Sequence, residues 1–299
     1  MVTGDAAAFT RPFASHWLEL PGGRYHYLDE GASDRPALMM VHGNPTWAFY
    51  FRHLVSAFRE RYRVIVPDHM GCGLSDKPRD YPYTLEQHIR NLEALVSHLD
   101  LEGMTLLMHD WGGAIAMGYA TRHPDSVARC VVFNSAAFYL PRCPLRIRIC
   151  RVPVFGALLV RGMNGFLHAS FRYATSRPER FSEEVRAGYL APYPDWNSRV
   201  AIHAFVKDIP LETRHPTRGI LDDIDRKLAS LSGKPMLILW GADDFCFTKT
   251  HFLPEWRRRF ADAECHVLDG TGHYVVEDAH ERIVPLIDDF LKRTATRPS

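Results

Sequence analysis

The sequence has little net charge and lacks the long apolar runs of membrane-spanning proteins. Its 36 basic and 35 acidic residues leave a formal net charge of +1, so no overall field favours nucleic acid or anionic lipid. No apolar run approaches the ~20 residues that a spanning helix needs. The sequence also lacks the pattern of a secretory leader, which is a basic segment followed by an apolar stretch. We therefore expect a cytoplasmic protein that neither binds nucleic acid nor spans a membrane.

Paired metal-binding and redox motifs are also missing. Six cysteines show no CxxC spacing, which predicts free thiols that fill the core of a protein in a reducing compartment. These cysteines are Cys72, Cys130, Cys143, Cys150, Cys246 and Cys265. Of the sixteen histidines, none belongs to an HExxH sequence. We therefore expect no metal and no cofactor.

Short apolar segments alternate with helical ones through most of the chain. Helices are predicted at 46–60, 84–99 and 281–292, the second with Thr84 and Gln87 as a capping box. An early antiparallel strand is predicted, followed by buried parallel strands. The predicted strands are Tyr25–Leu28, 37–41, 63–66, 104–108, 129–133, 235–240 and 264–268. This alternation predicts an α/β fold with a mostly parallel, doubly wound sheet.

The alternation stops between residues 138 and 215. This stretch has no convincing strand and is rich in proline, arginine and aromatic residues. It predicts a helical cap over the carboxyl edge of the sheet, inserted between core segments 1–137 and 216–299. The cap contains an apolar run, Val152–Val160, that is bracketed by Arg146, Arg148, Arg151 and Arg161. We expect this run to pack on the core or to line an apolar tunnel; a docking surface for a partner or a membrane is the alternative.

A predicted strand, a sharp turn and a helix surround Asp110. The segment Met108–Gly113 follows the apolar run Thr105–Leu107 and precedes Ala114–Met117. This is the layout of the nucleophile elbow of the α/β-hydrolase fold, with aspartate at the tip instead of serine. A carboxylate is nucleophilic at neutral pH without a base, and its attack leaves an ester between enzyme and substrate. The elbow therefore predicts alkyl-transfer chemistry rather than peptide hydrolysis.

The remaining parts of such a site follow in the chain order that the fold requires. Gly270–Tyr274 follows the last predicted strand and offers His273 as the general base. Asp243 and Asp244 follow the strand before it, and either could orient the histidine. We favour Asp244 because GxxD is the usual register. In this fold the acid can also follow the predicted strand 129–133. That position holds Asn134, which carries no charge to stabilise an imidazolium.

Hydrogen-bond donors are predicted on either side of Asp110. The segment His42–Pro45 follows a core strand, and its loop should give one backbone N–H of an oxyanion hole, with the N–H of Trp111 as the second. The side chains of Asn44 and Trp111 also carry N–H groups that could converge beside the nucleophile. Such a pair suits a leaving anion that needs no proton, such as halide or carboxylate. Packing alone is the alternative role of Trp111.

These motifs together resemble the haloalkane dehalogenase family of α/β-hydrolases. The resemblance rests on HGNPTW at 42–47, HDWGG at 109–113 and GHY at 272–274, and it covers nearly the whole chain. It implies roles for five residues: Asp110 as nucleophile, His273 as base, Asp244 as acid, and Asn44 with Trp111 as a clamp for the leaving anion.

Within that family the chain more closely resembles the cis-β-lactone decarboxylases of long-chain olefin biosynthesis. The stretches that carry this resemblance are 67–78, 134–138, 191–193, 196–199, 207–210 and 244–247. The resemblance implies that Asp110 opens a β-lactone bearing two alkyl chains, after which CO2 and a cis-alkene leave. It also implies an apolar small-molecule substrate and partner enzymes of the same pathway that contact the cap.

Three other functions stay open at this point. A haloalkane dehalogenase would use Asp110 to displace halide and His273 to activate water against the resulting ester. An epoxide hydrolase would need cap tyrosines to protonate the epoxide oxygen, for which the candidates are Tyr173, Tyr189 and Tyr193. A receptor without catalysis could keep the fold, but it would not need the full set of reactive side chains.

Overall fold

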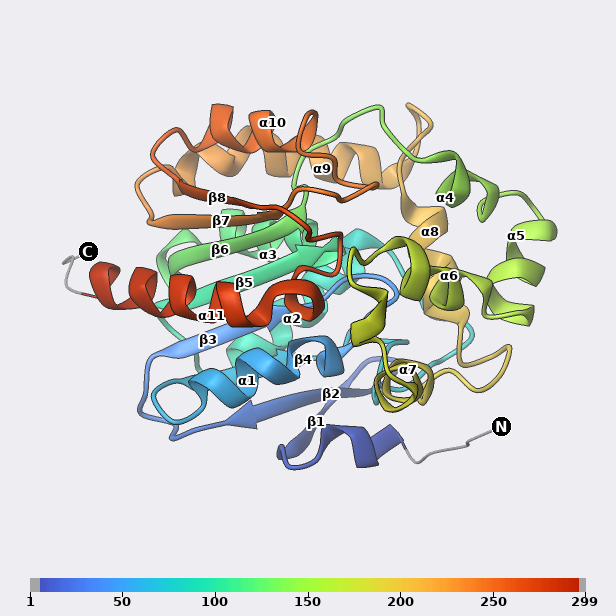
Figure 1. Cartoon of the computed structure of the whole chain (residues 1–299), viewed down its shortest axis with the longest axis horizontal. Helices are drawn as coiled ribbons and strands as arrows, with labels where there is room; N and C mark the ends of the chain where they lie inside the picture. The colour runs from blue at the N-terminus through green and yellow to red at the C-terminus, as the bar shows by residue number, and fades with distance from the viewer. Residues whose placement is uncertain (1–5, 296–299) are drawn as a thin grey trace.

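The computed structural model of the chain describes residues 6–295 and contains one eight-stranded sheet with helices on both faces (Figure 1). The strand order is β1-β2-β4-β3-β5-β6-β7-β8. β1 (Ser15–Leu20) and β2 (Gly23–Glu30) pair antiparallel, and β2 is also antiparallel to β4. The other pairings are parallel. The parallel strands are β3 (Ala37–Val41), β4 (Arg63–Pro67), β5 (Met104–Asp110), β6 (Val127–Ser135), β7 (Met236–Gly241) and β8 (Glu264–Leu268). The predicted mostly parallel α/β sheet is confirmed.

Both faces of the central strands are apolar because helices cover both. In β3, Met39 and Val41 contribute to one buried cluster, and Leu38 and Met40 to the other. This is the period-two pattern expected of a strand buried on both sides. One face is covered by α1 (Arg52–Phe58) and α11 (Val275–Thr294). The other is covered by α2 (Leu85–His98), α3 (Trp111–Arg122), α9 (Pro216–Lys227) and α10 (Phe252–Arg259).

Some predicted boundaries differ from the structure. The helix predicted at 46–60 is a short 3-10 turn, η2 (Ala48–Phe51), followed by α1. The last helix begins at Val275 rather than at 281. Thr84 caps α2 by accepting the backbone N–H of Gln87 at 3.4 Å. The reciprocal half of the capping box does not form, because the Gln87 side chain donates to Asn91 instead.

Residues between β6 and α9 form helices beyond the carboxyl ends of the parallel strands, at the right of Figure 1. Within this stretch, which the structure describes throughout, there is no strand. We use the name cap for residues 138–215. Its helices are α4 (Leu145–Ile149), α5 (Phe155–Ala157), the π-helical η4 (Leu158–Gly162), α6 (Gly165–Tyr173), η5 (Pro178–Arg180), α7 (Glu183–Leu190) and α8 (Val200–Asp208).

The apolar cap run Val152–Val160 packs differently from the prediction. Gly156 and Val160 are buried and Leu159 lines a cavity, but the other large side chains of the run are exposed. The reason is local: Val154 has a φ of +63°, α5 has only three residues, and a π-helical turn follows. The apolar side chains therefore do not share one helix face. In residues 6–295, no helix has the length and apolar character to cross a bilayer.

Candidate active site

Asp110 lies at a sharp turn between β5 and α3, at the carboxyl edge of the sheet. Its backbone has φ of +53° and ψ of −127°, outside both helix and strand. The hydroxyl of Ser135 on the neighbouring strand donates to the Asp110 carbonyl. Gly112 permits the turn to pack closely, since a Cβ there would lie 2.0 Å from the carbonyl oxygen of Val41. The elbow is therefore held from both adjacent strands.

The Asp110 carboxylate is buried and accepts a backbone hydrogen bond. The N–H of Asn44 donates to Oδ1 at 2.6 Å. Burial raises the pKa of Asp110, while nearby His273 and the N–H groups of Asn44 and Trp111 lower it; the net pKa is above the ordinary aspartate range. The carboxylate is thus poorly hydrated, as suits a nucleophile, yet is stabilised by fixed donors.

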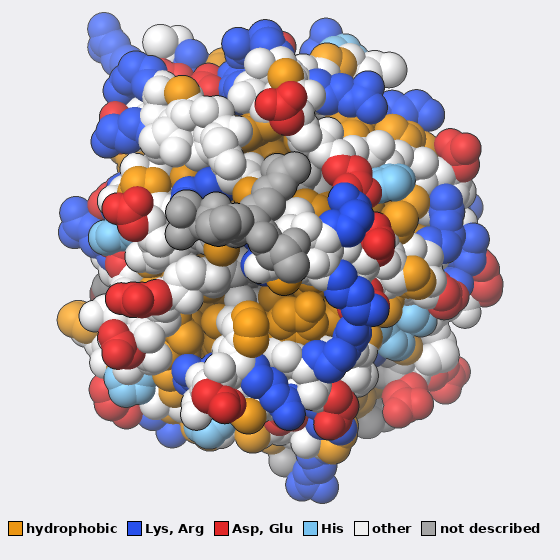
Figure 2. All heavy atoms as spheres, turned by 90° about the vertical axis from the view of Figure 1, so that its left-hand side faces the viewer, with side chains coloured by type: hydrophobic (Ala, Val, Ile, Leu, Met, Phe, Trp, Pro, Cys, Tyr) orange, Lys and Arg blue, Asp and Glu red, His pale blue; other side chains and the backbone are white. Residues whose placement is uncertain are grey.

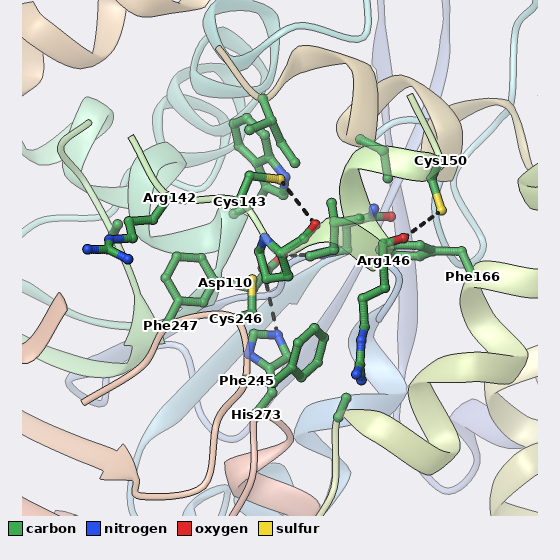
Figure 3. A pocket seen from close by; sticks show the side chains of 18 of the residues that line it. Asp110, Arg142, Cys143, Arg146, Cys150, Phe166, Phe245, Cys246, Phe247 and His273 are labelled. Atoms are coloured by element: carbon green, nitrogen blue, oxygen red, sulfur yellow. Dashed lines mark hydrogen bonds and ion pairs between the residues drawn. The ribbon is translucent and has the colours of Figure 1, made fainter. Parts of the chain in front are cut away.

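His273 lies between Asp110 and Asp244. Its Nδ1 is 2.8 Å from Asp244 Oδ2, and its Nε2 is 3.7 Å from Asp110 Oδ2 (Figure 3 shows the pair with Asp110). Burial lowers the pKa of His273, but the two carboxylates raise it by more, so the net pKa lies above the ordinary value. The site therefore favours an imidazolium next to Asp110.

The structure separates the two candidate acids. Asp244 is buried and accepts the backbone N–H groups of Cys246 at 2.6 Å and Phe247 at 3.1 Å, besides its contact with His273. Asp243 is exposed, and its carboxylate accepts the hydroxyl of Ser176 at 3.1 Å. Only Asp244 is positioned to orient the imidazole.

Asn134 has a structural role in the site that the sequence did not indicate. Its Nδ2 donates to Asp244 Oδ2 at 2.8 Å and to the Gly241 carbonyl at 3.1 Å, while its Oδ1 accepts the Gly241 N–H. Asn134 therefore holds the acid in place instead of replacing it. No motif could have indicated this contact, because 110 residues separate Asn134 and Asp244.

Two further residues hold the loop of His273. Asp278 accepts the N–H of Gly272 at 2.7 Å and the N–H of Ser176 at 2.8 Å, and so ties this loop to the cap. The ring of His109 contacts the His273 carbonyl through Nε2 at 2.8 Å. Burial keeps the pKa of His109 well below its usual value, so this ring is neutral. Sequence reasoning identified neither contact.

The loop after β3 is fixed by paired histidines behind the site. His42 Nε2 accepts the N–H of His69 at 3.0 Å, so its Nδ1 carries the proton and donates to the Gly43 carbonyl at 2.8 Å. This arrangement sets the loop directly against the Asp110 side chain. A Cβ on Gly43 would lie 2.2 Å from Asp110 Oδ1.

Gly43→Ala should therefore displace the Asp110 carboxylate. A misplacement on the order of 1 Å costs roughly 10²-fold in rate, so we expect a loss of that order in kcat in steady-state kinetics. Gly219→Ala is the matched control, because a Cβ there meets nothing within 4 Å. Equal activity of the two variants would contradict the described packing around Asp110.

The side chains of Asn44 and Trp111 both line the cavity beside Asp110. One N–H of the Asn44 amide donates to the Ile202 carbonyl at 3.2 Å, and its second N–H is left for a ligand. The Trp111 indole packs near Phe205 with 5.6 Å between ring centres. Among residues 6–295, none accepts a hydrogen bond from the Trp111 indole. Their predicted role as an anion clamp stays a prediction.

The cavity above Asp110 has a volume of about 470 Å³, which suits a ligand of drug size. Its walls come from the core and from the cap and are mostly apolar (Figure 3). All six cysteines are free. Cys143, Cys150 and Cys246 line this cavity, and they also belong to or pack against a hydrophobic core cluster, as predicted.

Of the three candidate tyrosines, one reaches the cavity. Tyr173 lines it and is half exposed. The Tyr189 hydroxyl donates to Glu277 at 2.6 Å, and the Tyr193 hydroxyl accepts the N–H of Gly73 at 3.1 Å. These three residues therefore do not form a proton-donating pair for an epoxide. Residues 6–295 also contain no group of three or more His, Cys, Asp or Glu side chains arranged to hold a metal ion.

The pKa of Asp110 gives a prediction for the pH dependence of activity. As the predicted nucleophile, Asp110 must be ionised to attack, and burial raises its pKa. Protonation should therefore abolish turnover at a higher pH than for an ordinary aspartate. We expect a profile of kcat/KM against pH whose acid limb has its midpoint above the ordinary aspartate range. A midpoint at or below that range would contradict the burial of an ionisable nucleophile.

Comparison with known proteins defines the class of this enzyme. A family model described as alpha/beta hydrolase fold matches residues 36–279. The chain belongs to this family and is an enzyme of the alpha/beta-hydrolase superfamily.

Within this superfamily the chain is similar to two kinds of enzyme. The chain is 43% identical, over 95% of its length, to cis-3-alkyl-4-alkyloxetan-2-one decarboxylase of Shewanella oneidensis, 90% of which is covered. It is 33% identical, over 92% of its length, to haloalkane dehalogenase 2 of Mycobacterium tuberculosis, 94% of which is covered. The solved structure of haloalkane dehalogenase DatA from Agrobacterium tumefaciens C58 aligns with a TM-score of 0.85 and 28% identity, covering 96% of this chain and 99% of that one. The resemblance predicted from the motifs is confirmed.

Proposed function

We propose that this protein is a β-lactone decarboxylase that converts a cis-3-alkyl-4-alkyloxetan-2-one to a cis-alkene and CO2. The observation that carries the proposal is the buried Asp110 carboxylate at the floor of an apolar cavity, in a chain 43% identical to a decarboxylase of that name. The carboxylate supplies a nucleophile, and the apolar walls suit alkyl chains. The relative supplies the substrate class.

In the proposed mechanism Asp110, His273 and Asp244 act as a triad. Asp110 attacks the alkyl carbon that bears the ring oxygen of the lactone. The bond between that carbon and the ring oxygen breaks, and the oxygen leaves as part of a carboxylate. A free N–H of Asn44 and the indole N–H of Trp111 bind that carboxylate, and the imidazolium of His273 adds a positive charge. Asp244 holds the imidazolium at 2.8 Å.

The second step returns the enzyme to its starting state. The new carboxylate leaves as CO2, and the electrons of its carbon–carbon bond form the alkene. The same electron flow breaks the ester bond and releases Asp110 as a carboxylate. Atoms and charge balance without water and without a proton donor. Apolar walls favour both steps, because they exclude the water that would hydrolyse the ester.

A haloalkane dehalogenase is the second candidate. The structural match to DatA and the 33% identity to haloalkane dehalogenase 2 favour it. In that reaction Asp110 displaces halide, the two N–H donors bind the halide, and His273 activates water against the ester. The same site geometry serves both reactions until the Asp110 ester has formed. The reactions differ in the next step, because the decarboxylase ester loses CO2 and the dehalogenase ester is hydrolysed.

Turnover of two substrates side by side tests the proposal. The enzyme is incubated with a synthetic cis-dialkyl β-lactone and, separately, with 1-bromobutane or 1,2-dibromoethane, and alkene and bromide are followed. We expect alkene from the lactone at a rate far above bromide release. Bromide release without action on the lactone would assign the protein to the dehalogenases, and turnover of neither would contradict both assignments.

A further inference from the structure

The outer end of the cap combines exposed apolar side chains with an unbalanced positive charge. Five large apolar side chains there are more than half exposed: Leu145 (71%), Val154 (75%), Phe155 (54%), Leu158 (54%) and Met163 (71%). They lie in the segment from α4 to the turn after η4, and α5 is its outermost element in Figure 1. We call residues 145–163 the cap tip. Exposed apolar side chains gathered in this way indicate a contact surface.

The charge around the cap tip differs from that of the rest of the chain. Residues 138–178 contain seven arginines and no aspartate or glutamate, in a protein with a net charge of only +1. One of them, Arg151, pairs with Glu212 at 2.8 Å. Within the described range 6–295, the other six have no carboxylate within ion-pair distance. At the opposite end of the molecule, acidic and basic side chains are mixed (Figure 2).

The backbone at the cap tip is strained in a way that keeps an apolar side chain exposed. Val154 has a φ of +63°, which is rare for a β-branched residue. Its side chain is the most exposed large apolar side chain of the tip. Strained backbone conformations of this kind are concentrated at functional sites. The Phe155 N–H donates to the Pro153 carbonyl at 2.7 Å across this turn, and the Val154 side chain itself points to solvent.

The cavity reaches the surface beside the cap tip. Among its lining residues, Arg142, Arg146 and Tyr173 are exposed, so the cavity wall there extends to the protein surface. The Arg146 guanidinium lies over the Tyr173 ring at 4.4 Å and over the Phe245 ring at 5.1 Å. The same segment therefore lines the cavity with its inner side and presents the apolar tip with its outer side.

We propose that the cap tip docks on the surface of an anionic phospholipid bilayer. Apolar side chains that protrude between cationic ones suit the boundary between headgroups and acyl chains, and unpaired guanidinium groups bind phosphate. Trp196, exposed under Arg161 at 4.5 Å, fits the headgroup level. Docking would let an apolar ligand pass between bilayer and cavity with little exposure to water. The membrane contact itself does not depend on the proposed function.

Vesicle flotation tests this inference without any turnover. The full-length protein is mixed with vesicles of phosphatidylglycerol and phosphatidylcholine in equal parts, or of phosphatidylcholine alone. We expect flotation with the anionic vesicles, much weaker flotation with the neutral ones, and loss of binding at high salt. The double variant V154D/F155D should bind at least about tenfold more weakly, because it places charge among the acyl chains.

Charge reversal and matched controls complete the test. Each basic residue near an anionic surface contributes about fivefold in binding, so Arg148→Glu should weaken binding by about tenfold or more. The controls are Val267→Asp on β8 and Arg257→Glu on α10, exposed positions outside the cap that should leave binding unchanged. Thermal unfolding confirms that each variant is folded.

Three results would overturn the inference. The first is no enrichment on anionic vesicles, and the second is equal binding by the tip variants and the controls. The third is self-association in solution that V154D/F155D abolishes, which would make a second copy of the chain the occupant of the tip. Since binding is measured without substrate, a failure of the decarboxylase proposal would leave each of these results unchanged.

Discussion

Asp110→Asn should lower turnover of the β-lactone by ~10⁴-fold or more, because it removes the carboxylate that we propose forms the ester. The fold should be retained. Asparagine tolerates the positive φ of +53° at this position, and its amide oxygen can accept the N–H of Asn44. We expect the unfolding free energy to change by no more than about 1 kcal/mol.

Single-turnover kinetics, together with thermal unfolding of the same preparation, measures this effect. Deamidation of the new asparagine would restore aspartate, so the mass of the peptide containing residue 110 is determined in parallel. Activity within about tenfold of the wild type, in protein free of deamidation, would exclude Asp110 as the nucleophile.

Asp244→Asn should lower turnover by about 10³-fold or more, because it removes the carboxylate that stabilises the His273 imidazolium. An amide oxygen can still accept the N–H groups of Cys246 and Phe247, but the amide nitrogen would then face Asn134 Nδ2 and His273 Nδ1, which contact Asp244 Oδ2. A fall in activity would therefore reflect the loss of both the charge and the acceptor that orient the imidazole.

Asp243→Asn is the matched control, one residue away. Asp243 is exposed and contacts Ser176 rather than the imidazole, so the variant should keep its activity within about twofold. Steady-state rates of the two variants decide between the acids. If Asp243→Asn were the impaired variant, the histidine would be oriented by the neighbouring carboxylate.

The parallel strands and the elbow could be predicted because their signals are local. A strand buried on both faces is a short apolar run, as at Ala37–Val41, where prediction and structure agree. Strand β1 was missed because Ser15–Leu20 is an edge strand whose residues are exposed or half-buried. Its sequence therefore lacks the apolar run that identified the others.

The supporting contacts of the site could not be predicted because they join distant segments. Asp110 ends β5, Asp244 and His273 follow β7 and β8, and parallel strands bring their carboxyl ends to one edge of the sheet. Asn134 in β6 and Asp278 in α11 hold them through contacts with Asp244 and Ser176, which are 110 and 102 residues away in the sequence. The exposure of the run Val152–Val160 was mispredicted because composition does not reveal a break at Val154.

Isotope labelling of Asp110 tests the central claim, that this carboxylate opens the lactone and is released without water. The enzyme turns over a dialkyl β-lactone in water enriched in ¹⁸O, and the peptide containing Asp110 is analysed by mass spectrometry. Each hydrolytic cycle would place a solvent oxygen in the carboxylate, whereas collapse of the ester to alkene and CO2 places none. The account predicts many turnovers to alkene with Asp110 unlabelled. Heavy oxygen in Asp110 after alkene formation would contradict it.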